Sequence, residues 1–580
     1  MIGGAISSRK KETPMLMLPS VRAIFIFSVL GLLYALLVGK AFYLQWGDSD
    51  FLQSQGAARY VRDIEIPGYR GRIVDRMGEP LAISTPVKSL WAFTGKLEID
   101  ERQLKDLAEL LNMSSSVLRD KINAAGDFVY LAQGISPEIA EKVLALRIPG
   151  LYDENIYRRF YPAGELTSQI IGFTDGKDQG QEGIELARQN LLSGKSGIRR
   201  VIINRKGQAV EDIAAVVAPQ QGRDLTLALD LRLQYLSQTE LKAAVIKHKA
   251  KMGSVVVLDA QTGEILALAN YPTYNPNNRS QITPSRMKSR ALVDTFEPGS
   301  TLKPFTAAIA LNHGKVKPNT VMNVIGGKMT IGNWTIHDAH QESNNLTVEQ
   351  VVQRSSNVGT ARMALMLTPG QMWQGLSAAG FGVPVGTGFP AEASGRLKPA
   401  KAWKTVEQAT ISYGHGVSVT LLQLAQAYTI FTTDGELKPA SLYKSEGIIY
   451  GKPVIAPETA KMMRGILEKS VQPGGTGFLA RVPDYRVAGK TGTARKPEKG
   501  GYSRKYVSSF VGFAPVTSPR LIVAVMIDEP SAGKYYGSHV AAPVFANITG
   551  KALRMLGMPS DRNIEQEIFP VDSEEIVEET

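Results

Sequence analysis

Cysteine is absent from this 580-residue chain. Its absence excludes a thiolate nucleophile, disulfide bonds and cysteine-bound zinc, and it suits an oxidising compartment. A strong charge of one sign is also lacking, because 66 Lys and Arg against 54 Asp and Glu leave a net charge of +12. No basic stripe is interleaved with aromatic residues, so we expect no nucleic-acid binding. The mild positive excess fits an anionic surface such as a membrane or a cell wall.

One long apolar stretch lies near the N-terminus, where residues 23–38 carry no charge. The stretch resumes after Lys40, whose amine can extend to the polar boundary of a bilayer. We therefore predict one transmembrane anchor at residues 23–46. Four basic residues precede it: Arg9, Lys10, Lys11 and Arg22. They predict a cytoplasmic segment at residues 1–22 and a large remainder outside. A cleaved signal peptide is the alternative, but no small-x-small cleavage site ends the stretch.

The residue composition and the pattern of predicted strands and helices change near residue 224. Residues 47–223 are polar and mixed, with short strand-like runs and a helical pattern at residues 101–112. A chain of 580 residues is too long for one hydrophobic core. We therefore expect a second domain at residues 224–560. Residues 561–580 are rich in glutamate and are predicted to be a disordered tail.

Strands are expected at both ends of the second domain. The segments GSVVVLD and EILALAN flank the turn AQTG and predict a β-hairpin between Gly253 and Asn270. Two more strands are expected within residues 507–528, and most of the sequence between these ends is helical in pattern. The sequence therefore predicts an α/β fold in which one sheet joins both ends of the domain.

A hydroxyl nucleophile is required for acyl transfer in a chain without cysteine, together with a base and donors for the oxyanion. Ser300 and Lys303 lie in FEPGSTLKPF, at the start of an apolar helical run. Their spacing places both side chains on one face of a helix. Ser300 then lies at the positive end of the helix dipole, and burial of Lys303 favours its neutral, basic form.

The Ser-x-x-Lys spacing is weak evidence for catalysis by itself, and two further motifs strengthen it. Ser355-Ser356-Asn357 comes just before a predicted helix, and Lys490-Thr491-Gly492-Thr493 lies on a predicted strand edge. Decoys of these two motifs occur at residues 343–345 and 195–197. The Ser-x-x-Lys spacing itself also occurs at Ser7, Ser8, Ser285, Ser441 and Ser531. Only the set at 300, 355 and 490 combines chain order, spacing and context.

These motifs resemble S-x-x-K, S-x-N and K-[ST]-G of the penicillin-recognising serine acyltransferases. The resemblance extends to the division-type class B penicillin-binding proteins, the FtsI group. It is carried by NYPTYNPNN, FEPGSTLKPF, SSNVG and the late GKYYGSHVAAPVF, and upstream by RGRIVDRMGEPLA, RRFYPAGELTSQIIGF and GQEGIE. The resemblance covers nearly the whole chain. It implies a serine β-lactamase-like transpeptidase domain at 224–560, preceded by an elongated α+β pedestal at 47–223, similar to the penicillin-binding protein dimerisation domain.

The resemblance implies a catalytic role for five residues. Ser300 attacks the penultimate D-alanine carbonyl of a stem peptide, and Lys303 takes the proton. Ser355 and Asn357 relay protons and hold the substrate amide. Lys490 supports this network electrostatically. An amine from a neighbouring stem peptide then accepts the acyl group.

A substrate-binding set is implied by the same resemblance. Thr491 and Thr493 bind the substrate carboxylate, and Gly492 lies between them on the strand. The backbone amides of Ser300 and Thr493 are expected to form the oxyanion hole. Tyr535 and Tyr536 are candidates for an aromatic wall of the cleft, although ordinary surface aromatics are nearly as good an interpretation.

The resemblance also implies substrates, partners and a location. Peptidoglycan stem peptides are the substrates, and β-lactams mimic the donor; no cofactor and no metal is expected. A single-pass protein of the bacterial inner membrane is predicted, with its catalytic domain in the periplasm and active in septal wall synthesis. An FtsW-type glycosyltransferase and other division proteins are the expected partners, because no glycosyltransferase signature precedes the catalytic motifs.

Alternatives on the same fold remain open from the sequence. An elongation-type transpeptidase differs only in its cellular role. A carboxypeptidase or β-lactamase transfers the acyl group to water, and a β-lactamase needs a carboxylate that the sequence does not identify. A non-catalytic β-lactam sensor or a division scaffold is a further alternative, although sensors carry additional membrane or signalling segments and a degenerate scaffold does not keep all three motifs.

Three groups of polar residues receive separate interpretations. His337, Asp338 and His340 predict a loop and no metal site, since no third ligand is placed beside the two histidines. His415 stands where the FtsI group often has an aromatic residue, and the hypothesis is that it makes activity sensitive to pH. Five residues are predicted to hold the pedestal together without catalytic roles: Arg70, Asp75, Gly78, Glu182 and Glu185.

Overall fold

The computed structural model describes most of the chain: residues 20–48, 61–66, 68–203, 209–339, 342–498 and 500–562. The predicted cytoplasmic segment before residue 20 and nearly all of the predicted acidic tail lie outside the described residues. The chain divides into two compact units. The first comprises residues 1–67 and 196–220, and the second comprises residues 68–195 and 221–580.

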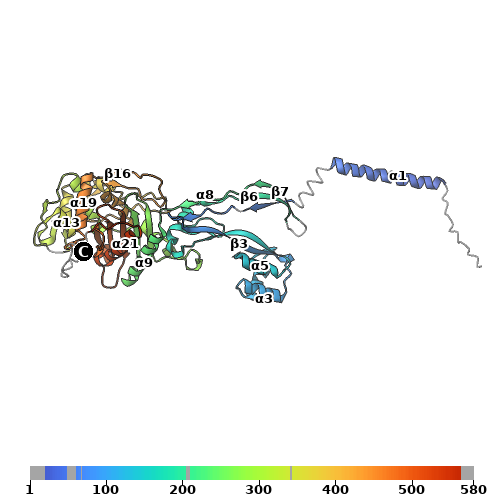
Figure 1. Cartoon of the computed structure of the whole chain (residues 1–580), viewed down its shortest axis with the longest axis horizontal. Helices are drawn as coiled ribbons and strands as arrows, with labels where there is room; N and C mark the ends of the chain where they lie inside the picture. The colour runs from blue at the N-terminus through green and yellow to red at the C-terminus, as the bar shows by residue number, and fades with distance from the viewer. Residues whose placement is uncertain are drawn as a thin grey trace, which may run out of the picture. The chain divides into compact units, whose positions relative to one another are not determined.

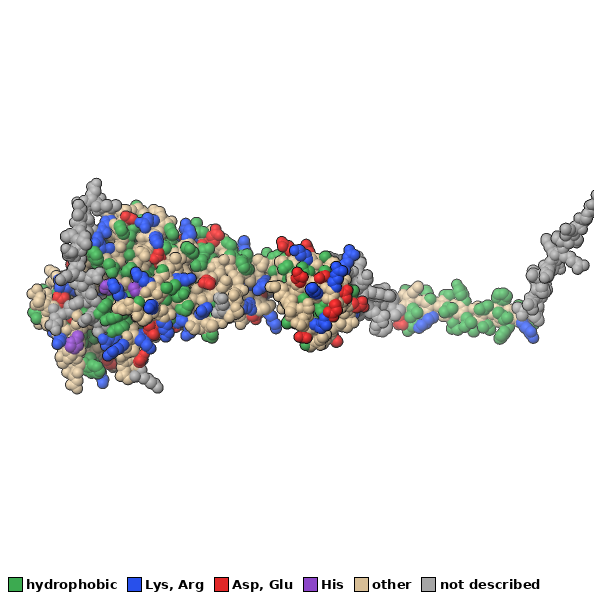
Figure 2. All heavy atoms as spheres, turned by 90° about the horizontal axis from the view of Figure 1, so that it is seen from below, with side chains coloured by type: hydrophobic (Ala, Val, Ile, Leu, Met, Phe, Trp, Pro, Cys, Tyr) green, Lys and Arg blue, Asp and Glu red, His purple; other side chains and the backbone are tan. Residues whose placement is uncertain are grey.

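An apolar helix and a small sheet make up the first unit. Helix α1 spans Ser20–Phe42 and continues as one π-helical turn, η1, over Tyr43–Gly47. None of the side chains in this 28-residue helix is buried, and Figure 2 shows hydrophobic side chains covering it. A helix of this length and composition suffices to cross a membrane. The predicted anchor at residues 23–46 lies within it.

The sheet of the first unit is antiparallel with the strand order β1-β6-β7. Its strands are β1 (Val61–Ile66), β6 (Gly197–Ile203) and β7 (Ala209–Val217). The chain therefore enters this sheet once before residues 68–195 and once after them.

A long strand, β3 (Pro80–Phe93), organises the early part of the second unit. It pairs with β4 (Phe128–Ile135) and β5 (Leu151–Phe160). Side chains alternate between the faces of a strand, so the fully buried Leu90 and Ala92 point to the same side. Three helices pack there: α3 (Glu101–Leu110), α4 (Ser115–Asn123) and α5 (Pro137–Ala145). Figure 1 shows α3 and α5 beside β3, away from α13 and α19.

A five-stranded antiparallel sheet forms the centre of the later part of the second unit. Its strand order is β10-β9-β19-β18-β17. The strands are β9 (Met252–Asp259), β10 (Ile265–Tyr271), β17 (Ala488–Glu498), β18 (Gly501–Ala514) and β19 (Leu521–Asp528). The predicted hairpin and the two predicted late strands are confirmed, and one sheet joins both ends of the domain. The predicted α/β fold class is therefore correct.

Helices cover both faces of this sheet. Along β9, Val255 and Val257 belong to a core shared with α9 (Leu231–Lys247) and α21 (Ala542–Met555). Val256 and Leu258 belong to the larger core on the opposite face, to which many other helices contribute. Among them are α11 (Arg290–Val293), α12 (Lys303–Asn312), α13 (Val348–Gln353), α14 (Asn357–Leu365), α15 (Pro369–Ala378), α16 (Thr405–Ile411), α17 (Leu421–Ala427), α18 (Thr429–Thr432) and α19 (Pro457–Lys469). Burial on both faces explains why β19 is apolar from Leu521 to Ile527, before it ends at Asp528.

Short elements complete the second unit. Two-residue strands β2 (Ile73–Val74) and β8 (Leu225–Thr226) extend the β3 sheet. The other short strands are β11 (Val321–Met322), β12 (Lys328–Ile331), β13 (Trp334–His337), β14 (Leu346–Thr347), β15 (Glu436–Leu437) and β16 (Lys452–Pro453). The short helices are α6 (Ser168–Ile171), α7 (Gly183–Ala187), α8 (Gln189–Leu192), α10 (Pro284–Met287) and α20 (Gly537–Val540).

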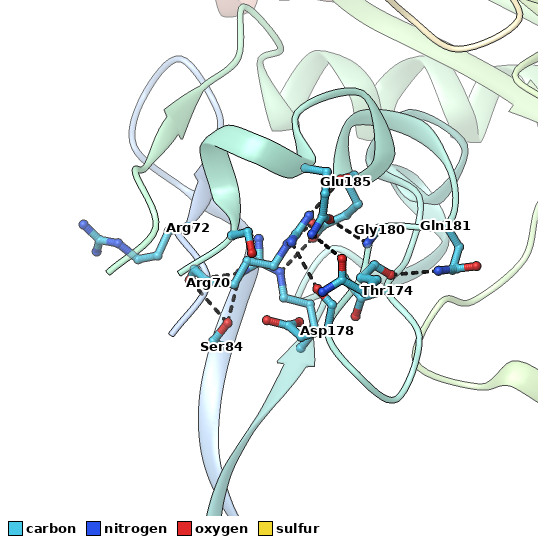
Figure 3. Close-up of polar contacts among 12 residues, drawn as sticks. Arg70, Arg72, Ser84, Thr174, Asp178, Gly180, Gln181 and Glu185 are labelled. Atoms are coloured by element: carbon cyan, nitrogen blue, oxygen red, sulfur yellow. Dashed lines mark hydrogen bonds and ion pairs between the residues drawn. The ribbon is translucent and has the colours of Figure 1, made fainter. Parts of the chain in front are cut away.

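A buried ionic cluster joins the early segments of the second unit. Arg70 Nε lies 2.5 Å from a carboxylate oxygen of Glu185, and both side chains are fully buried. Arg159 contacts the other oxygen of Glu185 at 2.7 Å. Figure 3 shows Arg70 and Glu185 pointing toward each other, with Asp178 nearby and Arg72 pointing away. Burial raises the pKa of the Asp178 carboxyl to about 6, although Arg70 and Arg159 oppose that shift. The predicted structural role of Arg70 and Glu185 is consistent with these contacts.

The other residues predicted to hold this region together differ in their contacts. Asp75 Oδ1 accepts hydrogen bonds from the backbone of Met77 and Glu79, and its Oδ2 accepts one from Leu231 at the start of α9. Gly78 has φ +93°, which a tight turn of this kind requires. Glu182 lies outside the cluster and lines a surface groove, where burial raises the pKa of its carboxyl.

Candidate active site

The predicted nucleophile lies in a turn that leads directly into a helix. Ser300 is half-buried in the 3₁₀ turn η5 (Gly299–Leu302), and Lys303 is the first residue of α12 with 1% of its surface exposed. Gly414 packs against the turn so closely that a Cβ there would lie 2.2 Å from the Gly299 carbonyl oxygen. The Tyr428 hydroxyl donates to the Thr301 carbonyl at 3.1 Å. These contacts hold the Ser300 backbone in place from two sides.

The second motif meets the first through Lys303. Lys303 Nζ donates to Ser355 Oγ at 2.9 Å and also contacts the Ser355 carbonyl oxygen. Ser355 has φ +65°, a left-handed conformation that costs a non-glycine residue about 1 kcal/mol. Ser356 caps helix α14, because its Oγ accepts from the Gly359 amide at 2.9 Å. The cap ends the strained turn and fixes the position of Asn357.

Asp338 anchors this motif, a role that the sequence did not suggest. Its Oδ2 accepts from Ser356 Oγ at 2.7 Å, and its Oδ1 accepts from the Val358 amide at 2.9 Å. The neighbouring His337 carbonyl accepts from Asn357 Nδ2 at 2.8 Å. The segment for which the sequence predicted a loop and no metal site therefore supports the S-x-N turn. A polar residue just after β13 was its only signal.

The third motif lies on β17, at the edge of the central sheet. Lys490 is fully buried, and its Nζ donates to Thr476 Oγ1 at 3.0 Å and to Thr491 Oγ1 at 3.2 Å. Thr493 Oγ1 accepts from the Gly537 amide at 3.0 Å. A hydroxyl that accepts one bond keeps its own proton for donation, so this bond leaves the Thr493 hydroxyl able to donate.

Strand β17 packs directly against the nucleophile turn. A Cβ at Gly492 would lie 2.9 Å from the Pro298 carbonyl oxygen, and a Cβ at Gly299 would lie 3.3 Å from that of Thr493. The close approach explains why glycine is needed in both segments. Three segments far apart in the sequence thus meet around Ser300.

Tyr535 and Tyr536 lie beside the same strand. The Tyr535 ring stacks on Tyr506 with centroids 4.1 Å apart, and its hydroxyl donates to that of Tyr536 at 3.0 Å. Gly537, the next residue, is the one that bonds Thr493. Both tyrosines are half-buried, so a row of rings lies next to the K-T-G-T strand.

The structure does not support a pH-sensing role for His415. Burial, and to a smaller extent the nearby Lys303 and Arg495, lowers the pKa of its imidazole to about 4. Its ring packs against Tyr413 and Tyr502, with centroids 5.2 and 5.7 Å away. The histidine stays neutral between pH 5 and 8, where the hypothesis required it to titrate. It acts there as an aromatic ring.

Metal binding has no support within the described part of the chain, where no three His, Asp or Glu side chains are grouped to hold an ion. His337 is exposed, and Asp338 bonds the second motif. His340 lies outside the described residues.

Comparison with known proteins identifies the class. The family model described as the penicillin binding protein transpeptidase domain matches residues 253–550, and the penicillin-binding protein dimerisation domain matches residues 65–227. The chain therefore belongs to the class B penicillin-binding transpeptidases, as the sequence motifs predicted.

Individual relatives cover nearly the whole chain. The probable peptidoglycan D,D-transpeptidase PbpC of Pseudomonas aeruginosa is 42% identical, over 90% of this chain and 93% of its own. The peptidoglycan D,D-transpeptidase FtsI of Escherichia coli is 39% identical, over 91% of this chain and 90% of its own. Penicillin-binding protein 3 of Mycobacterium tuberculosis, solved with aztreonam, is 27% identical with a TM-score of 0.67, over 86% of this chain and 98% of that structure.

Proposed function

We propose that this chain is a peptidoglycan D,D-transpeptidase that cross-links stem peptides at the division septum through a Ser300 acyl-enzyme. The observation that carries the proposal is the buried amine of Lys303. Lys303 follows Ser300 by three residues, about one helical turn, and its amine contacts the Ser355 hydroxyl. A buried amine bonded to a hydroxyl can accept the proton of the nucleophile and pass it on. The similarity to D,D-transpeptidases over nine-tenths of the chain supports the substrate.

The proposed reaction has two acyl transfers. Ser300 Oγ attacks the penultimate D-alanine carbonyl while Lys303 takes its proton. The terminal D-alanine leaves as the amine, with a proton passed through Ser355. The amine of a second stem peptide then attacks the ester carbonyl and gives one proton to the Lys303–Ser355 pair. The pair passes this proton to Ser300 Oγ as the ester bond breaks, which regenerates the free serine. Backbone amides of Ser300 and Thr493 stabilise the oxyanion in both steps.

The remaining motif residues are proposed to bind the donor. Asn357 holds its backbone amide, and the Thr491 and Thr493 hydroxyls hold its carboxylate beside Gly492. Lys490 keeps this end of the cleft positive, which favours a carboxylate. Tyr535 and Tyr536 are proposed as an apolar wall. A β-lactam occupies the same donor site, and its ring-opened ester is released slowly.

The cellular role is proposed from the anchor and the relatives. The apolar helix at Ser20–Gly47 and the basic residues before it favour a single-pass protein of the inner membrane with its catalytic domain in the periplasm. Similarity to FtsI favours septal synthesis. An FtsW-type glycosyltransferase and other division proteins are the proposed partners. Depletion of the protein in its own host should give filamentous cells; rounded cells would instead favour an elongation-type enzyme.

Intact-mass spectrometry of the detergent-solubilised full chain with benzylpenicillin tests the chemistry. We expect one adduct per chain, located on the Ser300 peptide, stable for many minutes and absent in Ser300→Ala. Ser285→Ala is the matched control, since Ser285 has the same spacing to a lysine but is exposed. Labelling of the Ser300→Ala chain would refute the nucleophile. Rapid loss of the adduct would instead favour a β-lactamase.

A further inference from the structure

Thr476 lies in a glycine-rich loop between α19 and β17 that no motif of the sequence covers. Gly474 has φ +81°, and a Cβ at Gly475 would lie 2.4 Å from the Ser470 carbonyl oxygen. The Gly477 amide donates to the same oxygen at 2.8 Å. Glycines on both sides thus let the loop fold tightly onto the end of α19, and this fixes the backbone of Thr476.

Thr476 touches the second and third motif regions at once. Its amide donates to the carbonyl of Gln353, two residues before Ser355, at 3.3 Å. Its Oγ1 accepts from Lys490 Nζ at 3.0 Å and lies 2.8 Å from Thr491 Oγ1. Only 3% of the residue is exposed. The residue therefore joins the end of α13 to the K-T-G strand.

A hydroxyl at this place directs the ammonium group of Lys490. An ammonium has three N–H donors, and the oxygens of Thr476 and Thr491 accept two of them. With these two donors fixed, the direction of the third is fixed as well. Hydrogen bonds of a charged group in a buried site are stronger than neutral ones. Valine has the same shape as threonine but leaves the ammonium without this acceptor.

We propose that Thr476 is a positioning residue for acyl transfer, which sets the orientation of the Lys490 ammonium relative to the Ser355 turn. The proposal rests on the proposed function of Lys490 in the donor site. Thr476 itself does not touch the reacting atoms. It acts through Lys490, and its loss should slow acylation of Ser300 more than it weakens binding of the donor.

Three substitutions in the full chain separate this role from simple packing. Thr476→Val keeps the volume and removes the hydroxyl, whereas Thr476→Ser keeps the hydroxyl and removes a methyl group. Thr549→Val is the matched control, because Thr549 is fully buried in α21 with a hydroxyl that has no hydrogen-bond partner. The acylation rate constant and the dissociation constant of the preceding complex are measured separately with a fluorescent penicillin, alongside the melting temperature.

A positioning role predicts that the valine substitution lowers the acylation rate constant, whereas the serine substitution lowers mainly the melting temperature. Thr476→Val should acylate about 10-fold more slowly at an unchanged dissociation constant, as expected for loss of one hydrogen bond to a charged group. Thr476→Ser should stay within about 3-fold of the wild-type rate, although loss of a buried methyl lowers its melting temperature. Thr549→Val should leave both constants unchanged.

Other results overturn the inference. Wild-type rates in Thr476→Val, or equally slow acylation in the serine variant, would show that the hydroxyl has no positioning role. A changed dissociation constant at an unchanged rate would have the same meaning. Labelling of Ser300→Ala in parallel reports separately on the proposed nucleophile. If Ser300→Ala loses labelling while Thr476→Val acylates normally, only the inference about Thr476 is refuted, and the proposed nucleophile stands.

Discussion

Two regions of the second unit bury positive charge in different ways. In the pedestal region, Arg70 and Arg159 share the carboxylate of Glu185. In the catalytic region, Lys303 and Lys490 are just as buried, but the contacts described above join them to hydroxyl and carbonyl oxygens. Both arrangements satisfy N–H donors. In the pedestal region, the ionised Glu185 also neutralises the charge.

The difference separates structural from chemical use of a buried cation. A guanidinium held by a carboxylate stays charged, and removal of one partner leaves the other uncompensated. An amine that contacts hydroxyl and carbonyl oxygens lies beside groups through which a proton can be transferred. We therefore expect charge-removing substitutions to affect stability in the pedestal and activity in the catalytic region.

Lys303→Met gives the largest expected effect and tests the catalytic side of the comparison. Without a base for Ser300, acylation by benzylpenicillin should slow by about 10³-fold or more. The melting temperature should stay the same or rise, because an apolar side chain replaces a buried amine. Time-resolved intact-mass spectrometry and thermal unfolding measure the two quantities. A severely destabilised but normally acylating variant would reverse the comparison.

Glu185→Gln tests the pedestal side. Arg70 and Arg159 then lose their common anion, and the free energy of unfolding should fall by about 3 kcal/mol. Acylation per folded molecule should change by less than about 2-fold, since the cluster contacts none of the motif residues. Asp224→Asn is the matched control: its ion pair with Arg72 is exposed and screened by solvent, so its loss should lower the stability far less. Equal losses in the two variants would contradict the structural role.

Asp178→Asn sharpens the comparison through pH. Burial raises the pKa of Asp178 from 3.8 to about 6, so the folded state binds a proton more tightly than the unfolded state. The wild type therefore loses stability as pH rises from about 4 to 6, whereas the neutral asparagine does not. We expect equal melting temperatures near pH 4 and an advantage of about 2 kcal/mol for the variant at pH 7.5. A constant difference across this range would argue against burial as the cause.

The sequence predicted the elements whose signals are local. The two apolar runs that flank the turn AQTG within residues 253–270, and the apolar run Leu521–Ile527, indicate strands whatever surrounds them, and these strands are confirmed. The three motifs could be placed on two helix starts and one strand because helix caps and periodicity are local as well. Their roles stay predictions, but their meeting around Ser300 agrees with what chain order and context implied.

The supporting residues could not be predicted in the same way. Asp338 and Thr476 bond the motifs only because β13 and the loop after α19 approach them in the folded chain. Neither residue lies near its partner in sequence, and neither is of an unusual type for a loop. His415 shows the opposite error: its residue type suggested titration, but burial, with a smaller contribution from Lys303 and Arg495, lowers the pKa of its imidazole.

His415→Tyr gives the smallest expected effect. It tests whether burial shifts the pKa of His415 as it shifts that of Asp178, each toward its neutral form. Asp178 titrates near neutrality because burial penalises its charged form, and the same penalty pushes the pKa of His415 down to about 4. Protonated His415 is therefore present only below about pH 5. Acylation rates of the wild type and the tyrosine variant should differ by a constant factor, within about 3-fold, from pH 5 to 8. A ratio that changes across this range would mean that the imidazole carries charge in the folded site, against its burial between two tyrosine rings.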